Sequence, residues 1–582
     1  MSVRMEDLDP KVIARGQEFF SSISGEAPSV FNKGWWTGKV MDWSMKNEAF
    51  KIQMFRFVDV LPYLNTSDSL SRHIEEYFAD DDANIPDVLK WGATKTKIGG
   101  GLVAKILNRT IRTNIEGMAR QFIIGQNTKE AMRGIEKLRK DGFAFVLDLL
   151  GEATVSEKEA DSYMQAYMEI LDAVAAAQPN WKGLGTGDDL DWGHAPKLNI
   201  AVKPSAFYSQ SKPVDMQGTV DGMMSRIEPI FKKVMTMSGF LCIDMESMKY
   251  KDATIELYKQ LRKKYPDYPH LGVVLQAYLR STEDDVQDLI EWARREALPI
   301  SIRLVKGAYW DYETIMAKQN GWQPPVWTHK AETDMAFEAV SMRILKNSDI
   351  CHFACASHNI RSVSAVMEMA EALNVPPERY EFQVLYGMAE PVRKGLQNVA
   401  GRVRLYCPYG DLIPGMAYLV RRLLENTANE SFLKQTFVDA ADMTHLLENP
   451  RTTQTREQAA RDDESAKSSD PNASTSDALP AFDNFPAVDF TIAAERKAFP
   501  DALAKVRAEM GATYPLRIGG EDVTTDDILE SYNPAAPAEI VGRVCQAGIP
   551  EVDAALNSAK TAYLSWRNVA PAERAGYLFR AA

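Results

Sequence analysis

The chain has 582 residues, of which 67 are basic and 80 acidic, and its formal net charge is −13. At roughly 150 residues per domain this length predicts three or four domains, and the composition excludes a collagen, a disulfide-stapled mini-protein and a wholly disordered chain. The acidic balance argues against a nucleic-acid partner, because phosphate binding needs an excess of Lys and Arg. Five cysteines are too few for a disulfide framework and suit a reducing compartment. With no apolar run of roughly 18 residues and no signal peptide in MSVRMEDLDP, we expect a cytoplasmic, multidomain protein.

The N-terminal region carries the pattern of helices. Apolar residues recur there at three-to-four spacing, which predicts a helical arm over 1–86 and a helical domain over 87–134. The stretch 102–125 is basic as well as amphipathic. Such a helix can lie on a membrane surface, but we favour packing against a neighbouring helix with the basic face in solvent.

From about residue 141 the pattern changes to short runs of Val, Ile, Leu and Phe that alternate with helical stretches. Strands that are apolar on both faces and alternate with helices indicate a parallel sheet covered by helices. The eight runs lie at 143–148, 198–203, 240–244, 272–276, 300–306, 351–356, 380–385 and 402–407. Their number and spacing predict an α/β fold, a (β/α)8 TIM barrel over residues 135–445.

Polar residues stand at or near the carboxyl ends of all eight predicted strands. These ends meet at one face of a TIM barrel, and that face holds the active site. The residues are Asp148, Glu152, Lys203, Asp244, Glu246, Gln276, Arg303, Lys306, His358, Asn359, Gln383 and Tyr406. We therefore expect them to contribute to one site.

An adjacent arginine pair marks the helix predicted after the last strand. At about 100° per residue, Tyr418, Arg421, Arg422 and Glu425 fall on one arc of GMAYLVRRLLEN, and its leucines and valine fall on the opposite arc. The pair can be a solvated basic face with Glu425 as its intrahelical partner. It can equally be a clamp for a carboxylate or phosphate, which planar guanidinium groups suit.

The fifth predicted strand contains two cations, Arg303 and Lys306, within an apolar run. Cations inside an apolar strand are costly unless an anion is near. Gly307, Tyr309 and Trp310 follow them, and this combination suits a phosphorylated planar cofactor such as a flavin or a nicotinamide. The alternative is internal pairing with an acidic residue of the neighbouring strands, namely Asp244, Glu246 or Glu381.

Lys203, at the end of the second predicted strand, is open to two interpretations. A buried lysine can be the Schiff-base nucleophile of a barrel lyase or aldolase. It can also contact an anionic substrate.

The segment CHFACASHN superficially resembles a set of metal ligands. The chain has only seven His, and no His-x-His ends the first strand, so we predict no metal site. We expect Cys351, Cys355 and Cys407 to be small core residues instead.

The barrel is followed by a change of composition. Residues 446–495 are rich in Ser, Thr, Asp and Ala, which predicts a flexible linker. Residues 496–582 then carry short strands, turns and two amphipathic helices, and the second helix stops without a cap or breaker. We interpret this segment as a truncated α/β fragment.

The strings LDLLGEA, DMESMKY, VLQAYLR, IRLVKGAYWDYE, SHNIRSV, YEFQVLYGMAE, RLYCPYG and AYLVRRLLENTANESF identify a family. Over about residues 135–435 the chain resembles the proline dehydrogenase domain of bacterial proline utilization A. The helices before it resemble the arm and helical domain of that family. With no ribbon-helix-helix region, the chain resembles the bifunctional type rather than the autogenous repressor type.

The C-terminal part resembles the start of the family's aldehyde dehydrogenase domain. The resemblance lies in ESYNPAAPAEIVGRV and LSWRNVAPAERAGYLFRAA, from about residue 515. The nucleophilic Cys and general-base Glu of such a domain lie far downstream, and Cys545 does not match the nucleophile motif. We therefore expect the second activity to be absent from this chain.

The resemblance implies FAD and oxidation of L-proline to Δ1-pyrroline-5-carboxylate, the first step of proline catabolism to glutamate. Hydride passes from proline C5 to flavin N5, and the electrons pass on to a membrane quinone. The proton acceptor for the substrate amine is not identified. An oligomer and a peripheral contact with the inner face of the cell membrane stay open, and no nucleic acid is implied.

The resemblance also implies roles for individual residues. Arg421, Arg422 and Lys203 form a carboxylate clamp. Tyr309 and Tyr406 wall the substrate ring, with Tyr418 beside them. Asp244 pairs with Arg421 and gates entry, with Asp148 and Glu152 nearby as counter-charges. The implied flavin contacts are Gln276, Arg303, Lys306, Gly307, Ala308, Trp310, Lys330, Thr333, Ser357, His358, Asn359, Gln383, Leu385, Arg422, Glu425, Glu430, Ser431 and Phe432.

Two alternatives from other functional classes remain. One is a Schiff-base barrel lyase that uses Lys203 and binds no flavin. The other is a non-enzymatic scaffold or membrane adaptor that uses the N-terminal helices.

Overall fold

The computed structural model describes residues 3–23, 120–185, 190–388, 390–411, 446–468 and 484–581, with single positions between 53 and 77 and the residues Tyr418, Arg421 and Arg422. The chain divides into two compact units, Met1–Thr491 and Ile492–Ala582. Most of the predicted helical domain lies outside the described residues. So do the implied flavin contacts Glu425, Glu430, Ser431 and Phe432.

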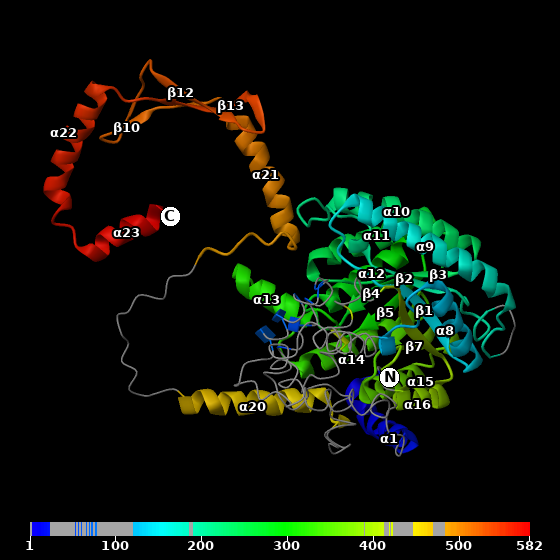
Figure 1. Ribbon diagram of the computed structural model, residues 1–582. Helices are drawn as coiled ribbons and strands as arrows, with labels where there is room; N and C mark the ends of the chain where they lie inside the picture. Colours follow the sequence, from blue (N-terminus) through cyan, green and yellow to red (C-terminus); the bar gives the residue numbers. More distant parts are fainter. Residues whose placement is uncertain are drawn as a thin grey trace, which may run out of the picture. The chain divides into compact units, whose positions relative to one another are not determined.

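Eight parallel strands close a barrel in chain order, so the predicted TIM barrel is confirmed (Figure 1). The first strand pairs with both the second and the last, which joins the two edges of the sheet. The strands are β1 Ala144–Leu149, β2 Asn199–Val202, β3 Phe240–Ile243, β4 Leu271–Gln276, β5 Ile300–Val305, β6 Cys351–Ala356, β7 Tyr380–Leu385 and β8 Val403–Tyr409. Each coincides with a predicted run to within a few residues.

Helices surround this barrel on its outside (Figure 1). They are α8 Thr128–Lys140, α9 Glu157–Ala177, α10 Met216–Thr236, α11 Met248–Lys264, α12 Thr282–Glu296, α13 Trp310–Asn320, α14 Lys330–Lys346, α15 Ile360–Ala372 and α16 Glu390–Ala400. Their apolar stripes pack against the outer faces of the strands, as Ile227, Leu257 and Val366 do with no exposed surface. This continuous core explains why the strands are apolar on both faces.

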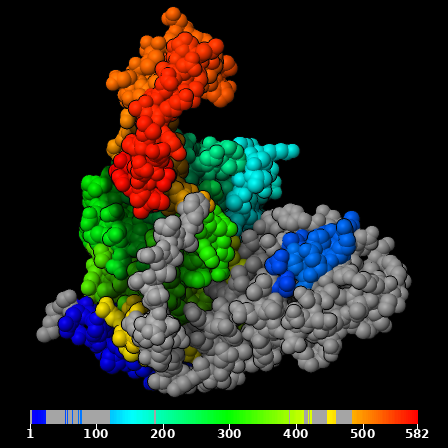
Figure 2. Space-filling model, turned by 90° about the vertical axis from the view of Figure 1, so that its left-hand side faces the viewer, coloured from blue at the N-terminus to red at the C-terminus, as the bar shows by residue number. Residues whose placement is uncertain are grey.

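The first helix, α1 Met5–Ile23, packs onto the barrel's outer helices. Its buried face carries Leu8, Val12 and Phe19 and lies against α15 and α16. The Arg361 guanidinium ties this region together, donating to Glu338 Oε1 at 2.9 Å, Asp9 Oδ1 at 2.7 Å and the Leu447 carbonyl at 2.7 Å. α1 therefore lies beside the start of α20, as the dark blue and yellow segments of Figures 1 and 2 show.

Helix α20 corrects the expected linker. Pro450–Ser468 form an α-helix within the segment 446–495 that we expected to be flexible throughout. Its first turns pack near α14, so tertiary contact adds to a sequence whose Gln, Arg, Glu and Ala residues favour helix. Composition alone predicted a flexible segment because it carries no information about such tertiary contacts.

The second unit contains the short strands and helices predicted for it. Strands β12 Ile528–Asn533 and β13 Ala536–Cys545 are antiparallel, and β9 Thr513–Tyr514 joins β13 in parallel. The other elements are β10 Leu516–Ile518, β11 Glu521–Val523, α21 Ala493–Glu509, α22 Ile549–Trp566 and α23 Pro571–Ala581. Many apolar side chains of this unit are exposed, including Leu578 at 74% and Phe579 at 76%.

Candidate active site at the carboxyl ends of the barrel strands

Four polar side chains form an inner cluster where strands β1, β2, β3 and β8 end or approach their ends: Asp148, Lys203, Asp244 and Tyr406. The Lys203 ammonium donates to Asp148 Oδ2 at 2.6 Å and to the Tyr406 hydroxyl at 3.1 Å, and it lies 3.7 Å from Asp244 Oδ2. The Tyr406 hydroxyl in turn donates to Asp244 Oδ2 at 2.6 Å. Since parallel strands bring these ends together, residues 258 positions apart in sequence share one buried network.

The charges of this inner cluster are set by burial and by mutual pairing. Burial raises the pKa of Asp148 to about 6, although Lys203 opposes the shift. Burial alone would lower the pKa of the Lys203 ammonium, but the carboxylates of Asp148 and Asp244 outweigh it and raise that pKa. Lys203 is therefore a cation, which suits contact with an anion and disfavours the free amine that a Schiff-base nucleophile requires.

Arg421 reaches the same end of the barrel, but its partner differs from the expected one. It forms a two-pronged ion pair with Glu152, whose oxygens accept from Nη1 at 2.6 Å and Nη2 at 2.8 Å. The predicted Asp244–Arg421 pair is wrong in this structure, because Asp244 instead accepts from Arg303 Nη1 at 2.7 Å. Arg421 therefore pairs with Glu152, and Arg303 of strand β5 pairs with Asp244.

Tyr309 completes this second group. Its hydroxyl donates to Glu152 Oε2 at 3.0 Å, and the Arg421 guanidinium carbon lies 4.7 Å from the centre of its ring. Burial opposes the charged form of Glu152, but Arg421 outweighs burial and lowers the pKa of that carboxyl. The solvated-face interpretation of the arginine pair therefore does not hold for Arg421.

Arg422 lies on the same helical stretch and is 6% exposed. Its guanidinium carbon lies 5.0 Å from the centre of the Tyr418 ring, and Tyr418 is 7% exposed. All three described residues of this stretch thus turn toward the protein interior. The expected intrahelical partner Glu425 is outside the described residues.

The two cations of strand β5 are paired internally, as the alternative interpretation anticipated. Arg303 pairs with Asp244, and the Lys306 ammonium donates to Asp334 Oδ1. Lys330, at the start of α14, donates to the other oxygen of Asp334 at 2.6 Å. Two ammonium groups share one carboxylate, so this corner of the site keeps a net positive charge that fits a phosphate.

The turn after strand β5 requires glycine. Gly307 has a φ of 137°, and a Cβ there would lie 2.5 Å from the Tyr278 ring. Ala308 follows it, and Trp310 then opens α13 with 42% of its surface exposed and its indole N–H donating to the Trp327 carbonyl at 2.9 Å. The Trp310 side chain thus presents a partly exposed aromatic surface at the start of α13.

The ends of strands β6 and β7 supply a further group of predicted residues. Asn359 caps α15 by accepting from the Ser362 N–H at 3.1 Å, and its own N–H donates to Ser357 Oγ at 3.1 Å. His358 Nε2 accepts from the Leu385 N–H at 3.1 Å. Burial, with help from Arg422, lowers the pKa of His358 to about 4, so its ring is a neutral acceptor.

For three further predicted flavin contacts, Gln276, Thr333 and Gln383, the structure gives their surroundings but no hydrogen bond to the two lysines. Gln276 donates to the Met245 carbonyl at 3.3 Å, and Thr333 is 9% exposed in the first turn of α14. Gln383 instead points deeper into the barrel, where its amide donates to Glu381 Oε1 at 2.6 Å. The structure therefore brings most, but not all, of the predicted set to one face.

The donor set fits the implied FAD. Lys306 and Lys330 offer positive charge for phosphate oxygens, and the N-terminus of α15, which follows strand β6, presents oriented N–H groups. Arg303 and the exposed face of Trp310 provide a cation and a flat surface for an aromatic ring. These are the two chemistries that a flavin dinucleotide requires.

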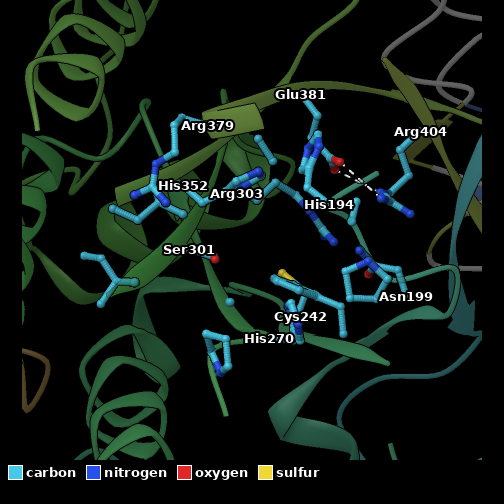
Figure 3. A pocket seen from close by; sticks show the side chains of 18 of the residues that line it. His194, Asn199, Cys242, His270, Ser301, Arg303, His352, Arg379, Glu381 and Arg404 are labelled. Carbon is cyan, nitrogen blue, oxygen red and sulfur yellow. Dashed lines mark hydrogen bonds and ion pairs between the residues drawn. The ribbon is translucent and has the colours of Figure 1, made fainter. Parts of the chain in front are cut away.

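A separate cavity of about 270 Å³ lies at the amino-terminal end of the barrel. Figure 3 shows His194, Asn199, Ser301 and His352 around it, together with the Glu381–Arg404 ion pair. Its lining includes Arg303, whose Nη1 donates to Asp244 of the inner cluster at the carboxyl end. Its lining is rich in polar and charged side chains, whereas layers of branched apolar side chains usually fill a TIM barrel.

The sequence prediction undervalued two carboxylates. Asp148 and Glu152 were expected only as nearby counter-charges, yet they are the direct partners of Lys203 and Arg421. Asp334, which holds both lysines, was not predicted at all. Its acidic side chain one turn into a helix carries no sequence signal of its own.

A closed (β/α)8 barrel with charged side chains gathered at its carboxyl end is typical of barrel enzymes, and this chain has both features. The family model for proline dehydrogenase matches residues 131–435, and the model for the proline utilization A N-terminal domain matches residues 9–122. The chain therefore belongs to the proline dehydrogenase family, as the sequence strings predicted.

Individual relatives agree with this assignment. The chain is 29% identical to the bifunctional protein PutA of Escherichia coli over 498 residues, which is 84% of this chain and 36% of that protein. It is 28% identical to the proline dehydrogenase of Deinococcus radiodurans over 56% of this chain and 91% of that protein. The chain thus spans about a third of the length of the Escherichia coli PutA protein.

Solved structures give the same result. The proline utilization A of Bdellovibrio bacteriovorus, inactivated by N-propargylglycine, is 38% identical, with a TM-score of 0.82 over 97% of this chain and 55% of that chain. The proline utilization A mutant D779W of Bradyrhizobium japonicum shares the fold at 21% identity, with a TM-score of 0.62 over 88% of this chain and 51% of that chain. In the described part of the chain, no helix is long and apolar enough to cross a membrane.

Proposed function

We propose that this chain uses FAD to oxidise L-proline to Δ1-pyrroline-5-carboxylate and passes the electrons to a quinone. The observation that carries the proposal is the convergence of Lys203 and Arg421 at one end of the barrel, each held by a carboxylate at 2.6 Å. Two oriented cations suit the carboxylate of a small amino acid. The family assignment selects proline among such substrates.

In this proposal Lys203 and Arg421 bind the proline carboxylate, with Arg422 as the third member of the clamp. Their side chains are fixed before substrate arrives, so little ordering remains to be done on binding. Tyr406 and Tyr309 are each anchored through their hydroxyl groups, which leaves the ring faces to orient the substrate ring. Both side chains are partly buried, so their rings would limit the access of water to the reacting carbon.

FAD, when bound, supplies the acceptor for the hydride that leaves proline C5. Lys306 and Lys330 would hold its phosphates, and Arg303 and Trp310 would contact its aromatic parts. The other predicted flavin contacts are assigned to it on the family resemblance. Arg303 would also place a positive charge beside the flavin ring system.

The quinone acceptor and a peripheral membrane contact belong to the same proposal and rest on the family resemblance. We also propose that the unit Ile492–Ala582 is the start of an aldehyde dehydrogenase domain. Its support is the similarity to the Bdellovibrio bacteriovorus chain over 97% of the present one.

The test is the visible flavin spectrum of the purified chain. The protein should be yellow, and L-proline should bleach it under anaerobic conditions. Arg421→Ala should need a far higher proline concentration for the same bleaching, whereas the exposed control Arg294→Ala should behave like the wild type. A protein that takes up no FAD would refute the proposal.

The barrel lyase alternative makes the opposite prediction. It requires borohydride trapping of a carbonyl substrate on Lys203 without a flavin. The ion pair between the Lys203 ammonium and Asp148 speaks against it.

A further inference from the structure

Three loops at the carboxyl end of the barrel meet at a single serine. Ser205 lies in the short turn after strand β2 and is 2% exposed. Its hydroxyl accepts from the Ala153 N–H of the β1 loop at 2.8 Å and donates to Glu246 Oε1 of the β3 loop. Its carbonyl accepts from the Thr154 N–H and hydroxyl, each at 3.3 Å. We call this set of contacts the Ser205 junction.

Glu246 commits both of its carboxylate oxygens to this junction. Oε2 accepts from the Ser205 N–H at 2.9 Å, while Oε1 accepts from the Ser205 hydroxyl. The residue is 3% exposed, and no cation among the described residues forms an ion pair with it. Among the described residues this buried carboxylate is hydrogen-bonded to Ser205 alone, and burial together with Glu152 raises its pKa to about 7.

The junction lies directly beside Lys203 of the proposed clamp and beside Glu152, the partner of Arg421. Lys203 precedes Ser205 by two positions, and Glu152 precedes Ala153 in the chain. Ala153 has a φ of 51° and follows Gly151, whose φ is 138°, so this loop holds a conformation that L-residues rarely adopt. An anchor is needed to hold such a backbone in place, and the Ala153 N–H supplies one through Ser205.

We propose that Ser205 and Glu246 are positioning residues that set the locations of Glu152 and Lys203, and through them of the carboxylate clamp. Glu246 fixes the turn after β2 from one side. Ser205 passes that constraint to the β1 loop, where Glu152 holds Arg421. Neither side chain is hydrogen-bonded to the Lys203 ammonium or the Arg421 guanidinium, so both act through their neighbours. This inference rests on the proposed function.

The inference separates binding from chemistry. Lys203, and Arg421 as oriented by Glu152, would bind the carboxylate in the ground state as well as during reaction. Loosening the junction should therefore raise the KM for proline and leave kcat nearly unchanged. Substitution of a residue that only supports the fold would lower the free energy of unfolding without raising KM selectively over kcat.

The first test is steady-state kinetics of Ser205→Ala in the FAD-loaded full chain. Losing the hydroxyl leaves the Ala153 N–H without its acceptor, so we expect the KM for proline to rise about tenfold and kcat to change less than about twofold. Ser341→Ala removes a buried hydroxyl from α14, away from the site, and serves as the matched control. An unchanged KM in Ser205→Ala would overturn the proposal.

Glu246 is tested by two substitutions of similar size. In Glu246→Gln the amide oxygen can accept from the Ser205 N–H and the amide nitrogen can donate to its hydroxyl, so KM should stay within about threefold of wild type. Glu246→Leu removes both contacts and should raise KM as Ser205→Ala does. Equal effects of the two variants would refute positioning by hydrogen bonds.

A double-mutant cycle shows whether the effect runs through Glu152. If it does, Ser205→Ala should raise KM much less in a Glu152→Gln background than in the wild type. Full additivity would contradict the proposed route. A wild type with no flavin or no response to proline would instead refute the proposed function, so the two failures are distinguishable.

Discussion

Lys203→Met provides a demanding test of the inner cluster. In the wild type, burial already raises the pKa of Asp148 from 3.8 to about 6, which corresponds to ~3 kcal/mol for keeping it ionised at neutral pH. The substitution removes the ammonium 2.6 Å from this carboxylate, and breaking a buried pair costs about 3–5 kcal/mol. We therefore expect the free energy of unfolding at pH 7 to fall by this amount. Adding Asp148→Asn removes the stranded charge and should restore roughly half of the loss.

The destabilisation caused by Lys203→Met should depend on pH. A carboxyl whose pKa is raised by folding destabilises the fold when it ionises, so its penalty is absent below pH 3.8 and grows as the pH rises to the folded value. The destabilisation by Lys203→Met should thus shrink from pH 7 to pH 5. Urea unfolding followed by tryptophan fluorescence measures it. Equal stability of wild type and variant at pH 7, or a further loss on adding Asp148→Asn, would refute this reasoning. Proline binding should stay weak in both variants.

Three other changes have defined outcomes. Arg421→Lys loses the two-pronged pair with Glu152 and should raise the proline KM by about 10-fold or more in steady-state kinetics. Glu381→Gln breaks the buried pair with Arg404 and should lower the free energy of unfolding by about 3–5 kcal/mol at pH 7 in urea titrations. Arg404 lowers the pKa of Glu381 to about 2 against burial, so this stabilisation is present above pH 4.5 and is lost as the pH falls toward 2. Gly307→Ala forces a Cβ to 2.5 Å from a buried tyrosine ring and should lower the flavin content of the purified protein, read from its absorbance ratio.

The sequence predicted the barrel because each strand carries its own signal. A strand buried on both faces is apolar throughout, and the helix after it restores the three-to-four spacing, so all eight strands could be located one by one. The carboxyl-end residues followed from the same logic, since the ends of parallel strands meet. The core positions of Cys351, Cys355 and Cys407 are likewise confirmed, with at most 1% of each exposed.

Pairing between side chains could not be predicted in this way. Arg421 could reach either Asp244 or Glu152, and the sequence gives no distance from one loop to another. The choice depends on the left-handed backbone at Ala153 and the Ser205 junction that holds it. Helix α20 was missed for a related reason, because its contacts with the barrel's outer helices are long-range.

By itself the sequence determined the family, the barrel and the set of charged residues at one end of it. These depend on local periodicity and on residue identity. Only the tertiary structure decided which acid neutralises which base, because an ion pair depends on a few ångströms between loops that lie far apart in the chain. That decision assigned Asp148 to Lys203, Glu152 to Arg421 and Asp244 to Arg303 within a chain of net charge −13.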